Sequence, residues 1–188
     1  DGAILKTTNQ GSNWELSSSS NFGLPVKNGF VFNENISGVV SGGTASGMIY
    51  ISSNGGSNWN SGFSSIIPIG SPGFIWLRGL YLVNENTYYV CGSEYGMIGP
   101  SFYVDGIIYK TTNTGANWFE SYRGSVDFYD IEFTNGDTGY CTWSSVLKTT
   151  NGGNFWSYFG EVNAVTFSIT HSFNDTLYMS GDSGLTYR

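Results

Sequence analysis

The sequence predicts an all-β protein built from repeated four-stranded sheets, and three observations carry that prediction. Only 11% of the 188 residues are charged, whereas glycine contributes 27 residues and aromatic side chains 17%; this composition is typical of short strands joined by Gly and Asn turns. A nine-residue segment, Lys148 to Trp156, recurs at three earlier places. A short apolar run of β-forming residues precedes each copy. We therefore expect almost no helix.

The last eight residues of this segment, called the box below, follow the template Ser/Thr-x-Asn-x-Gly-x-Asn/Phe-Trp. Asn can hydrogen-bond the backbone two residues on and tolerates the left-handed region, and Gly adopts positive φ at little cost, so we expect a tight reversal between two strands. The Ser or Thr offers its hydroxyl to the turn, and the Trp wedges against a neighbouring sheet. The box residues that we interpret as structural are Asn9, Gly11, Trp14, Asn54, Gly56, Trp59, Asn113, Gly115, Trp118, Asn151, Gly153 and Trp156.

The spacing of the boxes sets the length of the repeat. The residue before each box is Lys6, Ile51, Lys110 or Lys148, and a fifth copy of the preceding strand falls at 184–188. The mean spacing is about 45 residues, the range in which the four-stranded blades of β-propellers recur. We therefore predict one propeller domain, or part of one, with repeats at 6–50, 51–109, 110–147 and 148–188.

The same order of strands can be traced through each repeat. A polar strand follows the Trp of the box, an apolar strand closed by an Asn-containing turn comes next, and a Gly-flanked strand and the strand before the next box complete the unit. The predicted strands are 15–20, 29–32, 38–42 and 47–51 in the first repeat, 80–83, 88–92 and 106–110 in the second, 128–133, 139–142 and 146–148 in the third, and 164–167, 177–180 and 185–187 in the fourth.

The long second repeat contains two insertions, 62–76 and 93–105, which we expect to form loops. Long loops on a rigid scaffold are frequent binding sites. The candidate ligand-binding residues in and beside them are Trp76, Arg78, Tyr95 and Tyr103. Plain surface elaboration that covers a blade edge stays open as the alternative.

Charge and residue counts argue against several classes of function. A formal charge of −7 supplies no basic surface for nucleic acid or for anionic membranes. His171, Cys91 and Cys141 show no metal-ligand spacing, and we expect neither a metal nor a cofactor. We interpret both cysteines as small buried side chains rather than as a disulfide bridge or a reactive thiol. No apolar run is long enough to span a membrane.

Three carboxylates, Asp127, Asp130 and Glu132, lie close together in one strand-like run. Strand periodicity places Asp130 and Glu132 on one face, where they could act as a pair. We interpret them instead as a solvated blade edge. His171 has no Ser or Asp partner nearby in the sequence, so a catalytic triad is unsupported.

The four boxes resemble the Asp-box, or BNR repeat, of sialidase-type propellers, Ser/Thr-x-Asp-x-Gly-x-Thr-Trp, with Asn9, Asn54, Asn113 and Asn151 in place of the Asp. The longer unit, with Lys-Thr-Thr-Asn-Gly-Gly-x-x-Trp, is similar to photosystem II assembly factor-like propellers, a group that includes many secreted bacterial proteins. The resemblance implies a propeller in which the boxes lie away from the binding face. These relatives use more blades than four, which favours an excerpt of a larger ring over a closed four-bladed one.

A sialidase would need an arginine triad for the sugar carboxylate, and this chain has only Arg78, Arg123 and Arg188, scattered through the sequence. We therefore expect a non-enzymatic recognition or scaffolding propeller that binds protein or glycan. The alternatives are a self-assembling subunit of an extracellular filament or array, joined through its terminal strands, an assembly chaperone like the photosystem II factor, and a sialidase-like hydrolase. We expect an extracellular or cell-surface location in a bacterium, with the periplasm or the thylakoid lumen as alternatives.

Overall fold

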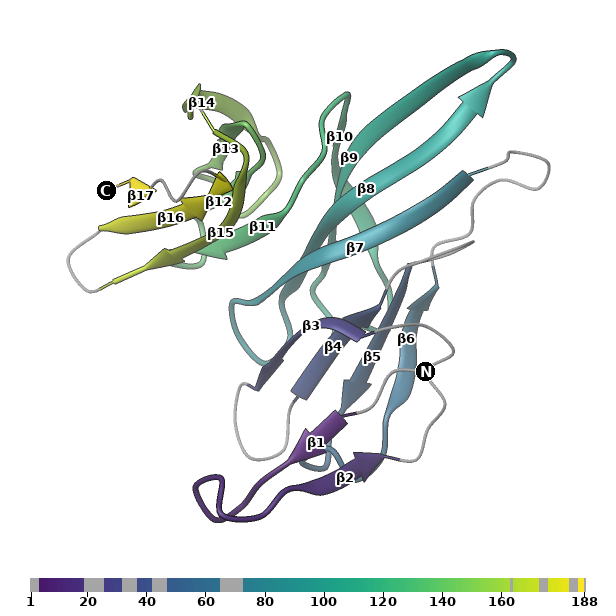
Figure 1. Cartoon of the computed structure of the whole chain (residues 1–188), viewed down its shortest axis with the longest axis vertical. Helices are drawn as coiled ribbons and strands as arrows, with labels where there is room; N and C mark the ends of the chain where they lie inside the picture. The colour runs from purple at the N-terminus through teal and green to yellow at the C-terminus, as the bar shows by residue number, and fades with distance from the viewer. Residues whose placement is uncertain are drawn as a thin grey trace.

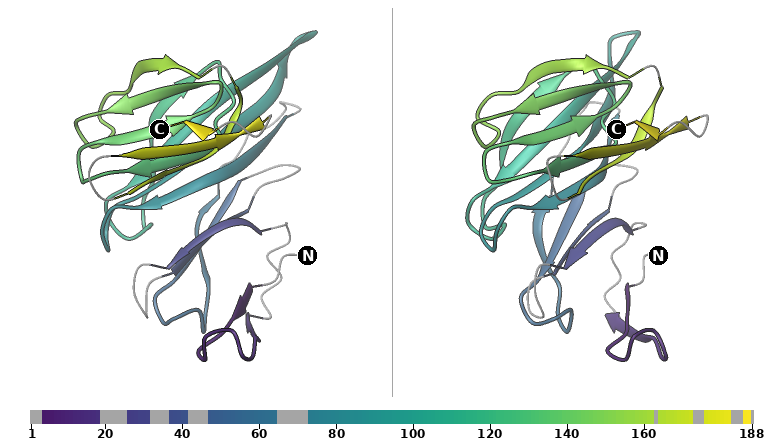
Figure 2. Two further views of the ribbon diagram at one scale, coloured as in Figure 1. Left: turned by 60° about the vertical axis from the view of Figure 1, so that its left-hand side comes forward. Right: turned by 90° about the vertical axis from the view of Figure 1, so that its left-hand side faces the viewer.

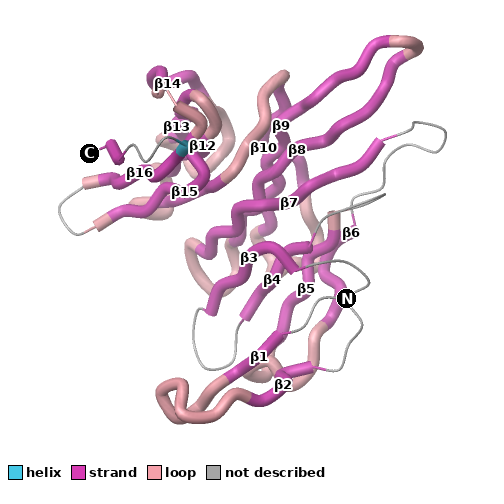
Figure 3. The backbone as a smooth tube through the Cα atoms, viewed as in Figure 1, coloured by secondary structure: helices cyan, strands magenta, loops and turns pink. Residues whose placement is uncertain are grey.

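The regular structure of this chain is β-strand, as the sequence predicts. The computed structural model describes residues 4–18, 26–31, 37–41, 47–64, 73–162, 164–172, 176–182 and 186–187. No α-helix occurs among these residues, and the short cyan mark in Figure 3 is a single 3-10 residue, Asp182. Within that part of the chain, accordingly, no helix has the length and apolar character needed to cross a membrane.

Three four-stranded antiparallel sheets occupy the middle of the chain (Figure 1). Within each sheet, every strand pairs with the strand that precedes or follows it in sequence, because short turns join consecutive antiparallel strands. The strands are β3 (Val26–Val31), β4 (Ser37–Ser41), β5 (Met48–Ser52) and β6 (Asn60–Ser64); β7 (Gly73–Leu82), β8 (Tyr88–Ile98), β9 (Ser101–Thr111) and β10 (Phe119–Gly124); and β11 (Asp130–Phe133), β12 (Gly139–Thr142), β13 (Ser145–Thr149) and β14 (Ser157–Glu161).

Smaller sheets flank these three along the chain. A hairpin of β1 (Ile4–Lys6) and β2 (Glu15–Ser18) comes before them, and a sheet of β15 (Thr166–His171), β16 (Leu177–Gly181) and β17 (Thr186–Tyr187) comes after. The hairpin and the last sheet lie at opposite ends of the molecule (Figures 1 and 2). The first strands of successive sheets, β3, β7, β11 and β15, contact one another. This arrangement is the all-β, propeller-like fold that the repeats predict.

The second, third and fourth boxes each join the third strand of a sheet to the fourth, and the first box joins β1 to β2. The blades are therefore offset from the sequence repeats, since a blade ends only after the strand that follows the Trp. Residues 65–72 of the first predicted insertion lie outside the described residues, and 73–76 belong to β7.

The loop predicted at 93–105 is wrong. Strands β8 and β9 run through it as a continuous ladder, with Tyr95 opposite Val104 and Met97 opposite Phe102. Only Gly99 and Pro100 turn the chain, and Gly99 adopts φ 60°. The large side chains of this segment, Tyr95, Phe102 and Tyr103, therefore lie within paired strands rather than in a loop.

All four boxes fold alike, and the fourth illustrates the geometry. Thr149 Oγ1 donates to Asn151 Oδ1 (3.1 Å) and accepts from the backbone N–H of Gly153 (2.9 Å), while Asn151 Oδ1 also accepts from the N–H of Phe155 (2.9 Å). The left-handed residues are Gly152 (φ 63°) and Gly153 (φ 72°). Asn151 therefore acts through its side chain, four residues on rather than two, and does not itself adopt the left-handed conformation.

The apolar core lies between the sheets. One cluster joins β5 to β7, β8 and β9, and a second joins β8 and β9 to β11, β12 and β13. Strand β8 is buried on both faces: Tyr88 points into the first cluster, and Tyr89 and Cys91 point into the second. Cys91 and Cys141 are both buried and free, as predicted. Burial raises the pKa of the Cys141 thiol well above its ordinary value.

Asp130 and Glu132 do not form a solvated edge, so that interpretation is corrected. Asp130 Oδ2 accepts hydrogen bonds from Ser168 Oγ and from the backbone N–H of Ile169, both at 3.0 Å. Glu132 Oε1 contacts the His171 ring at 2.5 Å. Burial raises the pKa of both carboxyl groups, and the hydrogen bonds from β15 offset part of that effect. The two carboxylates join the inner strands of neighbouring blades.

Candidate recognition surface

Four aromatic side chains gather on one face of the extended part of β7, β8 and β9. Phe74 lies opposite Tyr95 in the ladder, and the rings stack with their centroids 4.8 Å apart. Trp76 meets both rings, at 5.2 Å from Phe74 and 5.5 Å from Tyr95. Phe102 completes the group, 6.2 Å from Tyr95. We call these four residues the aromatic surface.

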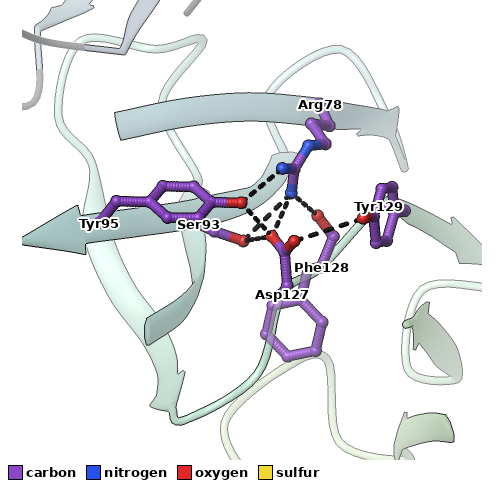
Figure 4. Close-up of polar contacts among 6 residues, drawn as sticks. All are labelled: Arg78, Ser93, Tyr95, Asp127, Phe128 and Tyr129. Atoms are coloured by element: carbon purple, nitrogen blue, oxygen red, sulfur yellow. Dashed lines mark hydrogen bonds and ion pairs between the residues drawn. The ribbon is translucent and has the colours of Figure 1, made fainter. Parts of the chain in front are cut away.

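An ion pair fixes the aromatic surface to the next blade (Figure 4). Arg78 Nη1 donates to Asp127 Oδ1 (2.5 Å) and to the backbone oxygen of Phe128 (2.7 Å), and Nη2 donates to the Tyr95 hydroxyl (2.7 Å). Ser93 and Tyr95 both donate to the same Asp127 oxygen. Asp127 lies between β10 and β11, so this network connects β7 and β8 to the entry of the following blade.

Hydrogen bonds within the network keep Arg78 and Asp127 charged although both side chains are partly buried. Burial by itself would raise the pKa of Asp127, but hydrogen bonds from Ser93, Arg78 and Tyr95 outweigh it and lower that pKa below its ordinary value. Burial also opposes the charge of Arg78, yet the hydrogen bonds to Asp127 and Tyr95 raise the pKa of its guanidinium. Burial and the bond to Asp127 raise the pKa of Tyr95, which keeps its phenol protonated.

These contacts give Arg78 a positioning role. Its Nη1 and Nη2 atoms already serve the protein, and its guanidinium lies over the Tyr129 ring at 4.6 Å and the Trp76 ring at 5.5 Å. An anionic ligand would have to displace Asp127. What the surface offers to a partner is therefore apolar: Trp76 is 42% exposed and Phe102 is 64% exposed, with Met97 also exposed nearby.

Tyr103, the fourth residue proposed from the sequence, lies on the opposite face of the same hairpin. It pairs with Gly96, and its hydroxyl donates to Glu94 Oε1 (2.7 Å). Glu94 in turn accepts from Arg123 at 2.9 Å. The structure thus brings Trp76, Arg78 and Tyr95 together and leaves Tyr103 outside the group.

Sequence reasoning missed Ser93, Phe102 and Asp127 as members of the site, and it also missed Phe74. A signal for the first two exists, because Ser93 and Tyr95 alternate along β8 and a two-residue turn would place Phe102 on their face. Asp127 follows a different strand and reaches Arg78 only through blade packing. No local pattern in the sequence could have placed Asp127 beside Arg78.

The aromatic surface lies toward the end of the blade away from its box. The box at 111–118 joins β9 to β10 at the end where β7 meets β8, and Thr114 bonds to Asn86 there. Strand β10 then runs to the other end, where Asp127 and the β8–β9 turn lie.

Two other features bear on function. A polar groove of about 280 Å³ lies between the hairpin at 4–18 and the second box, apart from the aromatic surface, and its lining includes Lys6, Asn9, Glu15 and Gly55. Among the described residues, no group of three or more His, Cys, Asp or Glu side chains is arranged to hold a metal ion.

Known structures support the fold. The GH74 enzyme of Niastella koreensis aligns with a TM-score of 0.64 and 14% identity, over 97% of this chain and 30% of the enzyme chain. YCF48 bound to a D1 peptide aligns with a TM-score of 0.46 and 14% identity, over 98% of this chain and 71% of that one. YCF48 from Cyanidioschyzon merolae aligns with a TM-score of 0.45 and 13% identity, over 98% and 76% of the two chains. Neither a family model nor a curated protein sequence matches this chain. The similarity is therefore one of β-propeller-like fold.

Proposed function

We propose that this chain is a non-enzymatic recognition propeller that binds a protein partner through the aromatic surface. The observation that carries the proposal is the combination of exposed rings with a rigid anchor. Trp76 and Phe102 expose large apolar areas. The Tyr95 hydroxyl is fixed by two hydrogen bonds, because it accepts from Arg78 and donates to Asp127. Rings held in place before binding lose little conformational entropy on binding, which favours them as interface anchors.

The polar atoms of the site favour protein over glycan. Sugar recognition combines ring stacking with hydrogen bonds from free donors and acceptors, usually in a concave site. Here the Ser93 and Tyr95 hydroxyl groups and both terminal nitrogens of Arg78 bond within the protein. Apolar side chains of a protein partner need no such bonds, and exposed Met97 extends the surface that they could cover.

The proposal also places the repeats with the Asp-box propellers. Its support is the common geometry of the boxes, in which a Ser or Thr hydroxyl and an Asn side chain satisfy the same turn N–H groups each time. The extracellular or cell-surface location is part of the proposal and rests on composition, since hydroxyl and amide side chains rather than charged ones make the chain soluble.

A displayed library of random peptides tests the proposal. Peptides are selected on the wild-type chain and re-tested on the double variant Trp76→Ser/Phe102→Ser. Phe155→Ser serves as the matched control, because Phe155 is an equally exposed ring on a box turn. We expect peptides rich in apolar residues that bind the wild type and the control and lose at least about tenfold in affinity on the double variant.

Two results would overturn this function. Selected peptides that bind the double variant as well as the wild type would place recognition elsewhere. Binding of neutral oligosaccharides from an immobilised panel, dependent on Trp76, would replace the protein partner by a glycan. Near-ultraviolet circular dichroism shows whether each variant keeps the packed fold.

A further inference from the structure

Strand β9 has an edge that its neighbour β10 leaves open. Strand β10 pairs with β9 only as far as Gly106. The chain then turns away at Gly124, where the N–H of Val126 donates to the Gly124 oxygen (2.8 Å). Strand β9 itself continues to Ser101 beside β8, so the β8–β9 hairpin extends beyond β10 (Figure 1). We call residues 101–105 the open edge.

The backbone groups of two residues point out of the open edge. The two-residue turn of the hairpin makes Ile98 and Ser101 a hydrogen-bonded pair. Because such pairs alternate along an antiparallel ladder, the N–H and C=O groups of Phe102 and Val104 point away from β8. No hydrogen bond from a described residue reaches these outward groups. Each of the two residues thus offers one donor and one acceptor to an added strand.

The open edge lacks the features that protect exposed strands in other proteins. Natural edges are blocked by lysine, proline or a bulge, because unpaired backbone groups are a template for another strand. The open edge reads Ser-Phe-Tyr-Val-Asp, which contains neither lysine nor proline, and its register with β8 is regular. Phe102 is exposed, and Val104 is half-buried. Another strand can therefore reach this edge.

Side chains on one face of the open edge are apolar. Phe102 belongs to the aromatic surface, and Val104 lies on the same face, directly opposite Tyr95. Residues that lie opposite each other in an antiparallel pair place their side chains on one face. The residues of an added strand that bond to Phe102 and Val104 therefore direct their side chains onto the aromatic surface. Apolar side chains suit these positions.

The opposite face of the open edge is acidic. Arg123 Nη1 contacts Glu94 (2.9 Å) and Asp105 (3.5 Å), and Arg123 Nε contacts Glu120 (3.0 Å). Three carboxylates thus surround one guanidinium, which leaves this group with an excess of negative charge. The residues of an added strand that alternate with the apolar ones face this group. Basic side chains suit those positions, because they complement its charge.

We propose that the partner presents an extended segment that adds to the open edge as a strand antiparallel to β9. The inference rests on the proposed function, because the apolar residues of the segment cover the aromatic surface. The segment alternates apolar residues with lysine or arginine, and along 101–105 it takes the place that β10 occupies farther along β9. Backbone hydrogen bonds supply affinity, and the side chains on the two faces supply specificity.

Synthetic peptides of about seven residues, in which valine alternates with lysine, test the pairing. Fluorescence anisotropy measures their affinity for the wild-type chain. N-methylation at the valines removes the N–H groups that face β9 and should weaken binding at least about tenfold. N-methylation at the lysines is the matched control, because those N–H groups point away from β9, and it should change affinity less than about threefold. Glutamate in place of lysine should weaken binding at least about tenfold.

Val104→Pro tests the same edge from the side of the protein. Proline removes the outward N–H of residue 104 without breaking a bond to β8, and edge strands tolerate it at such positions. We expect the variant to fold and to bind the valine–lysine peptide at least about tenfold more weakly than the wild type. Phe155→Ser is the control, because Phe155 lies on a box turn outside the binding surface. Near-ultraviolet circular dichroism shows whether each variant keeps its packed fold.

The results separate this inference from the proposed function. Binding that is lost in Trp76→Ser/Phe102→Ser but withstands both valine methylation and Val104→Pro would overturn strand addition and leave the function standing. Binding that does not depend on Trp76 and Phe102 would overturn both. A peptide that fails to bind the wild type would overturn strand addition, and the displayed library would still decide the function.

Two other outcomes would also overturn the inference. A loss on methylation at the lysines instead of the valines would contradict the antiparallel pairing. A wild type that dimerises in sedimentation, together with a monomeric Val104→Pro, would make a second copy of this chain the occupant of the open edge.

Discussion

Replacing Thr149 by Val removes one hydroxyl from the fourth box without changing the shape of the side chain. Thr149 is 1% exposed, and its Oγ1 accepts from the buried N–H of Gly153. The substitution leaves that N–H buried and unpaired, at a cost of about 1–3 kcal/mol. Asn151 Oδ1 loses one donor but keeps the N–H of Phe155. We therefore expect the free energy of unfolding to fall by about 2 kcal/mol.

Urea unfolding followed by tryptophan fluorescence measures this change, with the free energy extrapolated linearly to water. Thr150→Val is the control, because it makes the same substitution one residue on, at an exposed position, and should alter the free energy by less than about 0.5 kcal/mol. Thr7→Val makes the equivalent change in the first box and should lower the free energy of unfolding less than Thr149→Val does. The reason is that Gly11 is exposed, so water can replace the lost hydroxyl as the partner of its N–H. A loss below about 0.5 kcal/mol for Thr149→Val would refute the assignment of the hydroxyl as the essential partner of the turn.

Two further predictions concern titratable groups. The pKa of Asp127 is lower in the folded than in the unfolded chain, so its carboxylate contributes stability above the ordinary value of 3.8, and this contribution is lost as the pH falls through the folded-state pKa. The wild type should therefore exceed Asp127→Asn in stability near neutral pH, and urea unfolding at decreasing pH should show the difference shrink; a difference that grows in acid would contradict the ion pair. Cys91 and Cys141 are buried, and the raised pKa of Cys141 disfavours its thiolate, so a thiol reagent should label two groups rapidly only after unfolding. Rapid labelling of the native chain would show that the site opens.

The positions of the strands and turns follow from local chemistry. The box determines its own turn, because its hydroxyl, amide and glycine residues satisfy one another within eight residues. Its recurrence therefore predicted the blade hairpins and the all-β fold. Even the detail that sequence reasoning missed, the reach of Asn151 to Phe155, lies within the box.

Half of the candidate site was also predictable. Trp76, Arg78 and Tyr95 follow from the sequence as candidates in or beside the two insertions, and strand alternation explains why Trp76 and Tyr95 share a face. The prediction groups Tyr103 with them because side chains in a loop do not alternate between two faces as they do in a strand. Once the segment proves to be a ladder, a shift of a single residue relative to Val104 puts Tyr103 on the other face.

The sequence by itself determined the repeat, the box turns and the pairing of the strands that each box joins, because these depend on residues close together in the chain. Only the tertiary structure decided what happens between blades. The partners of Arg78 and of Asp130 lie 49 and 39 residues away, on neighbouring blades. Blade packing brings such groups together through the shape of the buried core, and that shape leaves no local pattern in the sequence.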